Sequence, residues 1–238
     1  MAIANRQSQL VAHGTGLSSA TASGDGYASN TLSGSLLVLV VWATGTSSNL
    51  GTAPAIGTPT TSGFTWTLAQ SNPFNDGGNL NGGRCSIYYI ANAGAMSSST
   101  STSVTATKSG SSPSSAVEFA CYEFSGVTTS SPLDQTVGKN SQTGTPVDAG
   151  SLVTLGTALI FAACIAEDAI STGSGFTSGI SSSTVFGGRS QYILNQTSGT
   201  IDTAFGANSE DYWGASAVDF LAATGVAVTT SQAFTFGF

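Results

Sequence analysis

The sequence predicts an all-β protein, an antiparallel β-sandwich built from two internally repeated halves. Segments rich in Val, Ile, Phe, Tyr and Thr recur between clusters of Gly, Ser, Asn and Pro, a pattern typical of strands joined by turns. No window of a dozen residues keeps a helical period, so we expect almost no helix. The third observation is the repeat of the first half of the chain in the second.

Two long motifs and several shorter ones return in the same order. GGRCSIYYIAN (82–92) returns as GGRSQYILN (187–195), and SAVEFACYEFSG (115–126) returns as SAVDFLAATG (216–225). The apolar run 36–43 pairs with 158–166, and GFT at 63–65 pairs with GFT at 175–177. We therefore expect a single β-sandwich domain, 1–238, made of pseudo-repeat halves 1–127 and 128–238.

The strands follow from these patterns in chain order. In the first half we expect them at 7–12, 36–43, 64–69, 84–91, 103–107 and 116–124. In the second half we expect them at 133–137, 158–166, 176–180, 190–194, 201–205 and 216–222. A last strand, 233–238 (AFTFGF), has no counterpart in the first half.

The burial of several strands can be predicted from the spacing of their apolar residues. Runs 36–43 and 158–166 are apolar on consecutive positions, so each should be buried on both faces. Two such strands are best buried against each other, which favours one sandwich with an internal pseudo-two-fold axis over two independent domains. Further along, Phe64, Trp66 and Leu68 alternate with Thr and should face the core. In 117–121, Val117, Phe119 and Cys121 should share one face of the strand, and Glu118 should project from the other.

Composition narrows the classes of function. Charged residues make up only 7% of the chain, against roughly 25% in ordinary soluble domains. Few surface charges mean little repulsion between closely packed copies, which favours a component of an assembly. The chain has five Lys and Arg against twelve Asp and Glu, for a net charge of −7. Nucleic-acid binding is therefore not expected, because it depends on basic side chains that displace counterions.

Membrane insertion and secretion are not expected either. The longest apolar runs are about half of the roughly 20 residues that a membrane-spanning helix needs. The N-terminus, MAIANRQSQLVAHG, lacks the charged and apolar regions of a signal peptide. We therefore expect the protein to be made in a cytosol.

The three cysteines, Cys85, Cys121 and Cys164, are odd in number and widely spaced. This spacing argues against a disulfide framework and against a CxxC metal or redox site. We expect small buried strand residues, with a Cys85 to Cys121 bridge as the alternative.

Few side chains suit catalysis, and we assign no catalytic, cofactor-binding or metal residues. His13 is the only histidine, and we expect it to be exposed at the end of the first strand rather than part of a triad. Glu118 and Asp219 are repeat-related carboxylates that could form a glycosidase pair. We favour a shared structural place, capping turns or pairing with Arg84 and Arg189.

Three other motifs have simple structural interpretations. The loop 71–83 (SNPFNDGGNLNGG) offers oxygen ligands for calcium but holds only one carboxylate, so we favour a flexible hairpin loop. The acidic pairs at 167–168 and 210–211 are expected to be solvated turn charges. The sequence NQT at 195–197 fits a glycosylation site, which we discount without a secretion signal.

Aromatic side chains on a sheet face could stack on sugars. The residues to consider are Tyr88, Tyr89, Tyr192, Tyr212 and Trp213. Most should be core. Tyr88 and Tyr89 are adjacent and must point to opposite faces, so one of them could be exposed.

The series SGSLLVLVVWA, GFTWTLAQ, RCSIYYIANAG, TSVTATKSG and SAVEFACYEFSGVTTSSPLD resembles a jelly-roll-like module of bacteriophage virion proteins and repetitive bacterial surface proteins. The resemblance covers most of 35–133, with a weaker second half. It implies a jelly-roll-like sandwich and carries over no catalytic or ligand residues. Without a signal peptide, a heptad repeat or a collagen-like shaft, the chain is most similar to a compact virion subunit.

These observations favour a non-enzymatic structural protein of a bacteriophage virion. Capsid decoration or cement is the first choice, and a tail or fibre component is the second. The expected partners are other virion proteins and further copies of this chain. We expect residues 233–238 to add a strand to a neighbour's sheet edge and the N-terminal arm before Gln7 to reach another subunit. No nucleic-acid or membrane partner is expected, and no cofactor. The alternative is a carbohydrate-binding, lectin-like adhesion module that recognises a surface glycan; an enzyme ranks third.

Overall fold

The computed structural model describes residues 2–17, 19–46, 53–75, 81–107, 114–141, 145–182, 187–206, 209–210 and 212–224. Every regular element in these ranges is a β-strand, and all pairings between named strands are antiparallel. The all-β prediction is confirmed. The strand expected at 233–238 lies outside the described residues.

The first half forms two sheets. Its strands are β1 (Ala4–Leu17), β2 (Ser19–Asp25), β3 (Ser35–Thr46), β4 (Ala55–Ile56), β5 (Thr60–Thr61), β6 (Phe64–Thr65), β7 (Thr67–Asn75), β8 (Asn81–Ala93), β9 (Ser101–Thr107) and β10 (Ser114–Ser125). The inner sheet of this half has the order β1-β10-β3-β8-β7. The outer sheet has the order β2-β9-β5-β6, with β4 also paired to β9.

The second half repeats this plan with shorter outer strands. Its strands are β11 (Leu133–Ser141), β12 (Thr145–Pro146), β13 (Ser151–Thr154), β14 (Ala158–Ala166), β15 (Thr177–Ser181), β16 (Arg189–Gln196), β17 (Gly199–Asp202), β18 (Ser209–Glu210) and β19 (Trp213–Leu221). The inner sheet has the order β11-β19-β14-β16-β15, and two small sheets, β13-β17 and β12-β18, form the outer layer.

Both halves pair their strands in the same nested way. In the first half, β1 pairs with β10, β2 with β9 and β3 with β8. In the second, β11 pairs with β19, β13 with β17 and β14 with β16. First-with-last pairing is that of a long hairpin wrapped into a sandwich, so each half is jelly-roll-like, and the predicted repeat of fold is confirmed.

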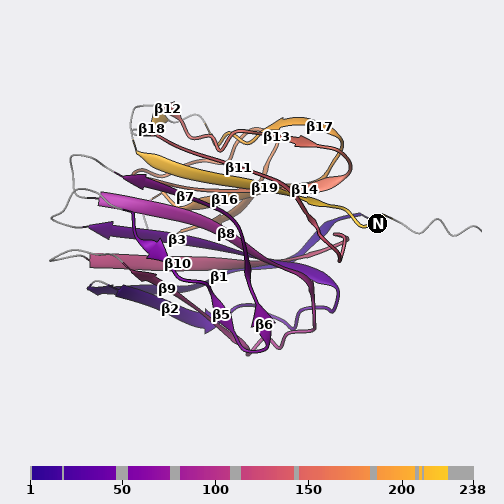
Figure 1. The fold of residues 1–238 in the computed structure, drawn as a ribbon, viewed down its shortest axis with the longest axis horizontal. Coiled ribbons are helices and arrows are strands. Elements are labelled where there is room, and N and C mark those ends of the chain that lie inside the picture. The colour runs from indigo at the N-terminus through magenta and orange to yellow at the C-terminus, as the bar shows by residue number, and fades with distance from the viewer. Residues whose placement is uncertain are drawn as a thin grey trace, which may run out of the picture.

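The sheets stack in four layers, with the two inner sheets back to back (Figure 1). Between the inner sheets lies the central core, whose buried members are Ile3, Leu36, Val38, Val40, Trp42, Phe74, Cys85, Ile87, Ala120, Tyr122, Phe124, Val127, Leu159, Phe161, Ala163, Ile165, Val218 and Phe220. A first-half core and a second-half core separate each inner sheet from its outer layer. Strands β3 and β14 are buried on both faces as predicted. We predicted one sandwich shared by the two halves. In the structure the two inner sheets form that sandwich, and each half adds an outer layer.

The backbone confirms the repeat at two turn positions. Asn92 and Asn195, which end the two GGR motifs, have φ angles of 49° and 56°. Gly63 and Gly175, which open the two GFT motifs, have φ angles of 79° and 82°. Asn and Gly are the residues that best tolerate the left-handed region, so these repeated letters specify repeated turns.

The motifs SAVEF and SAVDF do not occupy equivalent places, contrary to our prediction. Val117 faces the first-half core, whereas its sequence counterpart Val218 faces the central core. A shift of one residue along a strand moves every side chain to the other face. Glu118 and Asp219 therefore point into different layers of the stack.

The structure also differs from the sequence-based expectations at Leu68 and in the number of strands. Leu68 is 51% exposed, because the chain crosses from the outer sheet to the inner sheet at the buried Trp66 and the alternation stops there. The sequence patterns did not reveal β2 or β13. In β2, Ser and Thr alternate with alanines, which are too small to mark a strand by hydrophobicity, and β13 has only four residues. The residues before Gln7 contribute to the fold of their own chain: β1 starts at Ala4, and Ile3 is buried in the central core.

Candidate functional site

Three carboxylates of the described residues are buried, and each holds strands or loops together. Glu123 on β10 is 1% exposed. Its Oε1 accepts hydrogen bonds from the Leu32 N–H at 2.8 Å and the Ser35 hydroxyl at 2.7 Å, with Arg6 Nε at 3.5 Å. Its Oε2 accepts one from Gln7 Nε2 at 2.7 Å. We missed this residue, although the alternation along 117–123 places a glutamate on the apolar face.

The candidate carboxylate pair lies on different sheets. Glu118 points from β10 toward the second half, where it accepts a hydrogen bond from the Ser182 hydroxyl. Asp219 is fully buried and points from β19 toward the outer layer, where its Oδ1 accepts a hydrogen bond from the Gln135 N–H at 2.5 Å. A glycosidase needs two carboxyls that flank one bond. Glu118 and Asp219 do not form that arrangement.

Arg84 and Arg189 do not pair with these acids; each braces its own inner sheet. Arg84 Nε donates to the Pro54 carbonyl at 2.7 Å, and Arg189 Nε donates to the Thr172 hydroxyl at 3.0 Å. Each guanidinium also reaches a serine hydroxyl on the adjacent edge strand, at 3.3 Å and 2.7 Å. The predicted Arg–acid pairing is wrong, because both arginines point toward the edge strand on the side away from β10 or β19.

His13 is exposed in the interior of β1, opposite Glu118 in the register with β10. Its exposure was predicted, but its place at a strand end is wrong, since β1 continues to Leu17. A hydrolytic triad puts an imidazole between the nucleophile and the acid. Here the Ser182 hydroxyl donates directly to Glu118, so His13 does not lie between the hydroxyl and the acid as a triad requires.

Asp219 is the buried acid with a perturbed pKa. Burial raises the pKa of its carboxyl, and the charge of Asp134 raises it further, while the hydrogen bond from Gln135 lowers it. The nearby Thr154 hydroxyl also favours the charged form, yet it donates to the Gly156 carbonyl at 3.1 Å. Asp219 Oδ2 is therefore left without a hydrogen-bond partner among the described residues.

This environment predicts a pH effect on stability. Because the folded-state pKa is raised, this group's contribution to stability is fully present below about pH 3.9 and is lost as the pH rises through the folded-state pKa. We expect the free energy of unfolding of the wild type, relative to Asp219→Asn, to fall as the pH rises above about 3.9, the usual aspartate pKa. Urea unfolding of both proteins at several pH values measures this. A difference that stays constant or rises with pH would contradict it.

Side-chain amides of Gln and Asn connect distant segments of the chain through hydrogen bonds to the backbone. At three places, a side-chain amide donates a hydrogen bond to the backbone carbonyl of another residue and accepts one from the N–H of that residue, at distances between 2.6 and 3.1 Å. A neighbouring β-strand would make the same pair of bonds. This pairing joins Gln7 to Ser29, Gln135 to Val153, and Asn195 to Ile3. The Asn195 amide of the glycosylation motif is thus engaged in tying the N-terminal segment to the second half.

The cysteines are free thiols, buried as predicted. Cys85 faces the central core from β8, and Cys121 faces the first-half core from β10. Strand β3 lies between these two strands, so a bridge between them is ruled out. Burial raises the pKa of both thiols well above the usual value, which keeps them protonated and poorly reactive.

The candidate calcium loop is partly committed to the fold. Asn72 Nδ2 donates to the Ser216 hydroxyl at 3.0 Å, and Asn75 Oδ1 accepts from the Ala53 N–H at 2.6 Å. Residues 76–80 lie outside the described residues. Within the ranges described, no three His, Cys, Asp or Glu side chains gather as they would to hold a metal ion.

The aromatic residues considered for sugar stacking are not exposed. Tyr88 and Trp213 are buried, at 4% and 3% exposure. Tyr89, Tyr192 and Tyr212 are half-buried against the central core, with Tyr89 packed 5.4 Å from the Phe220 ring, centre to centre. The large hydrophobic residues that are exposed in the described structure are all aliphatic. None of the five residues therefore supports the lectin-like alternative.

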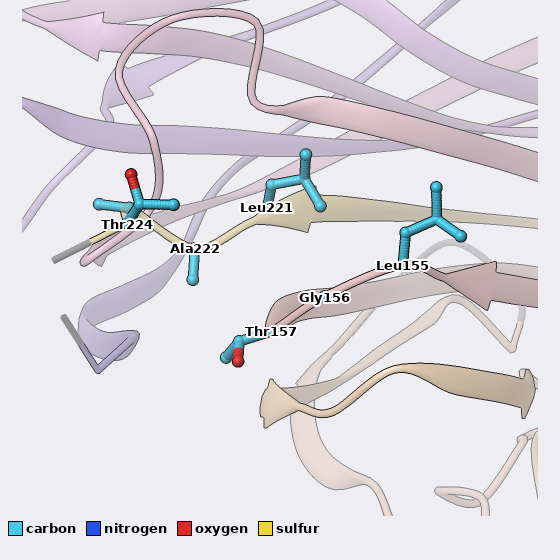
Figure 2. A pocket seen from close by; sticks show the side chains of 7 residues that line it. Leu155, Gly156, Thr157, Leu221, Ala222 and Thr224 are labelled. Carbon is cyan, nitrogen blue, oxygen red and sulfur yellow. The ribbon is translucent and has the colours of Figure 1, made fainter.

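Two hollows lie on the surface of the second half. One, of about 480 Å³, is lined by Leu155, Gly156, Thr157, Leu221, Ala222, Ala223 and Thr224 (Figure 2). The other, of about 520 Å³, has charged residues in its lining, among them the ion pair of Lys139 with Asp148, at 2.8 Å. The first has no charged side chain, and Leu155 at its rim is 76% exposed. We call it the end pocket.

No family model and no curated protein matches the chain. In the described part of the chain, no helix is long and apolar enough to span a bilayer. The observations on the molecule itself therefore carry the functional argument.

Proposed function

We propose that this chain is a non-enzymatic structural protein of a bacteriophage virion that decorates or cements the capsid, with a tail or fibre component as the second assignment. The groups that could do chemistry support a structural role. Glu118, Glu123 and Asp219 are buried and bonded to strands or loops, and the thiols are buried. The resemblance of 35–133 to virion modules supports the same role.

The observation that carries this proposal is the outward face of the first-half outer sheet. Strands β2 and β9 direct Ser and Thr outward, and their hydroxyls pair across the strands. Thr21 meets Thr105 at 3.0 Å, and Ser23 meets Ser103 at 2.7 Å. Asp25 is the one charged residue of these two strands. Such a face can pack against another protein with little electrostatic cost, and we assign it to the contact with the particle.

The test is quantitative mass spectrometry across a density gradient of lysate from the producing culture. We expect the chain to band with DNA-filled particles at hundreds of copies per particle, on the order of a capsid lattice. A few copies per particle would favour the tail assignment. If the chain stayed with soluble or envelope protein, the virion proposal would fail and glycan binding would be tested next.

A charge placed on the hydroxyl face tests the assigned contact. Thr21→Lys should weaken particle binding, because a lysine on this face of few charges would have to lose its water in the contact. Thr129→Lys, in the exposed turn before β11, is the matched control and should bind as the wild type does. Equal binding by both variants would overturn the assignment of this face.

A further inference from the structure

The end pocket is an uncharged hollow with a fixed frame. Leu155 and Leu221 lie on neighbouring segments with their side chains directed to the same side (Figure 2). The Ala222 N–H donates to the Thr157 carbonyl at 2.8 Å, and the Ala223 N–H donates to the Gly126 carbonyl at 2.8 Å. The first bond joins the two walls, and the second ties Ala223 to the chain just after β10. The lining is mostly apolar, so the pocket suits apolar side chains.

The chain beyond the end pocket has the composition to fill such a site. Thr224, the last residue of the described structure, lines the pocket. Residues 225–238 (GVAVTTSQAFTFGF) contain no charged side chain. Phe234, Phe236 and Phe238 occupy alternate positions, so an extended chain would present all three on one face.

The spacer before these phenylalanines favours a neighbour's pocket over its own. Residues 225–232 (GVAVTTSQ) are rich in Val and Thr, which favour extended backbone. They contain no Asn, Asp or Pro, and of the residues common in turns they hold only Gly225 and Ser231, one at each end of the spacer. An extended spacer would carry Phe234 up to about 33 Å from Thr224. The segment would thereby leave its own pocket and reach that of another molecule.

We propose that residues 233–238 of one copy insert their phenylalanine face into the end pocket of a second copy. The contact is heterologous, since a tail on one molecule meets a pocket on the next, so it can extend to further copies. It deepens the proposed function and rests on it for its biological use, because it names how neighbouring copies would be linked on a particle.

The experiment is sedimentation velocity on the purified full-length chain without particles. We expect wild type to self-associate with concentration. Two variants should weaken association at least tenfold: one with Phe234, Phe236 and Phe238 replaced by Ser, and Leu155→Asp. Val153→Asp is the matched control for the second, since Val153 is 47% exposed on the same segment but does not line the pocket.

Mixing the two variants gives the sharpest result. The tail variant keeps an intact pocket and Leu155→Asp keeps an intact tail, so together they should form a one-to-one complex that neither forms alone. A monomeric wild type, a mixture that does not associate, or equal association of Leu155→Asp and wild type would each overturn the inference. Because no particle is present, failure here is distinct from failure of the chain to band with virions.

Discussion

Replacing Phe161 with alanine is expected to lower the free energy of unfolding by about 3–5 kcal/mol. Phe161 is fully buried on β14, in the centre of the four layers. Its ring packs edge-on against Tyr122 at 5.0 Å and Phe124 at 6.1 Å, centre to centre. Both partners belong to β10 of the other half, so the cavity would open where the two halves meet. Urea unfolding monitored by tryptophan fluorescence measures the loss.

Phe176→Ala is the matched control. Phe176 is half-buried against the second-half core, so its removal should cost less than that of Phe161. The predicted single domain, 1–238, adds a further expectation: wild type and Phe161→Ala should each unfold in one transition, because the halves share a core. Equal losses for the two variants would contradict the assigned importance of the central core, and two separate transitions would contradict the single domain.

The second large effect is expected for Gly83→Ala, with a loss of about 1–3 kcal/mol. A Cβ at this position would lie 2.3 Å from Phe74 Cε1 and 3.1 Å from Ile165 Cδ1. Phe74 is 1% exposed in the central core, so its ring cannot move into solvent. The unfolding free energy of the variant measures the strain.

Gly94→Ala is the matched control for this change. Gly94 is exposed, and a Cβ there would meet only Phe64, at 4.0 Å. It should be close to neutral. Shortening the ring with Phe74→Leu should recover part of the loss caused by Gly83→Ala. If Gly83→Ala were as stable as Gly94→Ala, the tight packing of the Phe74 ring against this glycine would be disproved.

The repeated GGR motif is explained only by the folded protein, in which the second glycine of each copy lies against an aromatic ring. The second glycine of the other copy, Gly188, would bring a Cβ within 3.0 Å of the Trp42 ring. Trp42 Nε1 in turn donates to the Cys164 carbonyl across the interface at 2.9 Å. Each copy of the motif thus leaves space for an aromatic ring of the central core. The sequence shows that the glycines repeat but not which rings they accommodate: Phe74 comes from the neighbouring strand β7, and Trp42 comes from β3 of the other half.

The candidate functional residues were less predictable than the strands. The exposure of His13 and the burial of the cysteines follow from local alternation and residue type. The partners of Glu118 and Asp219 do not: Ser182 and Gln135 are each more than 60 residues away along the chain. The end pocket was not predicted, because its walls come from the β13–β14 connection and the end of β19. Neither segment has a distinctive composition.

The sequence alone determined that the protein is all-β, that its halves repeat, and that β3 and β14 are buried on both faces. Those properties depend on the two-residue period of a strand and on the letters at turns, which are local. Only the tertiary structure decided that four layers stack, that Val117 and Val218 face different cores, and which groups satisfy the buried carboxylates. A two-residue period tells which side chains share a face, but the layer that covers that face is chosen by long-range pairing and packing.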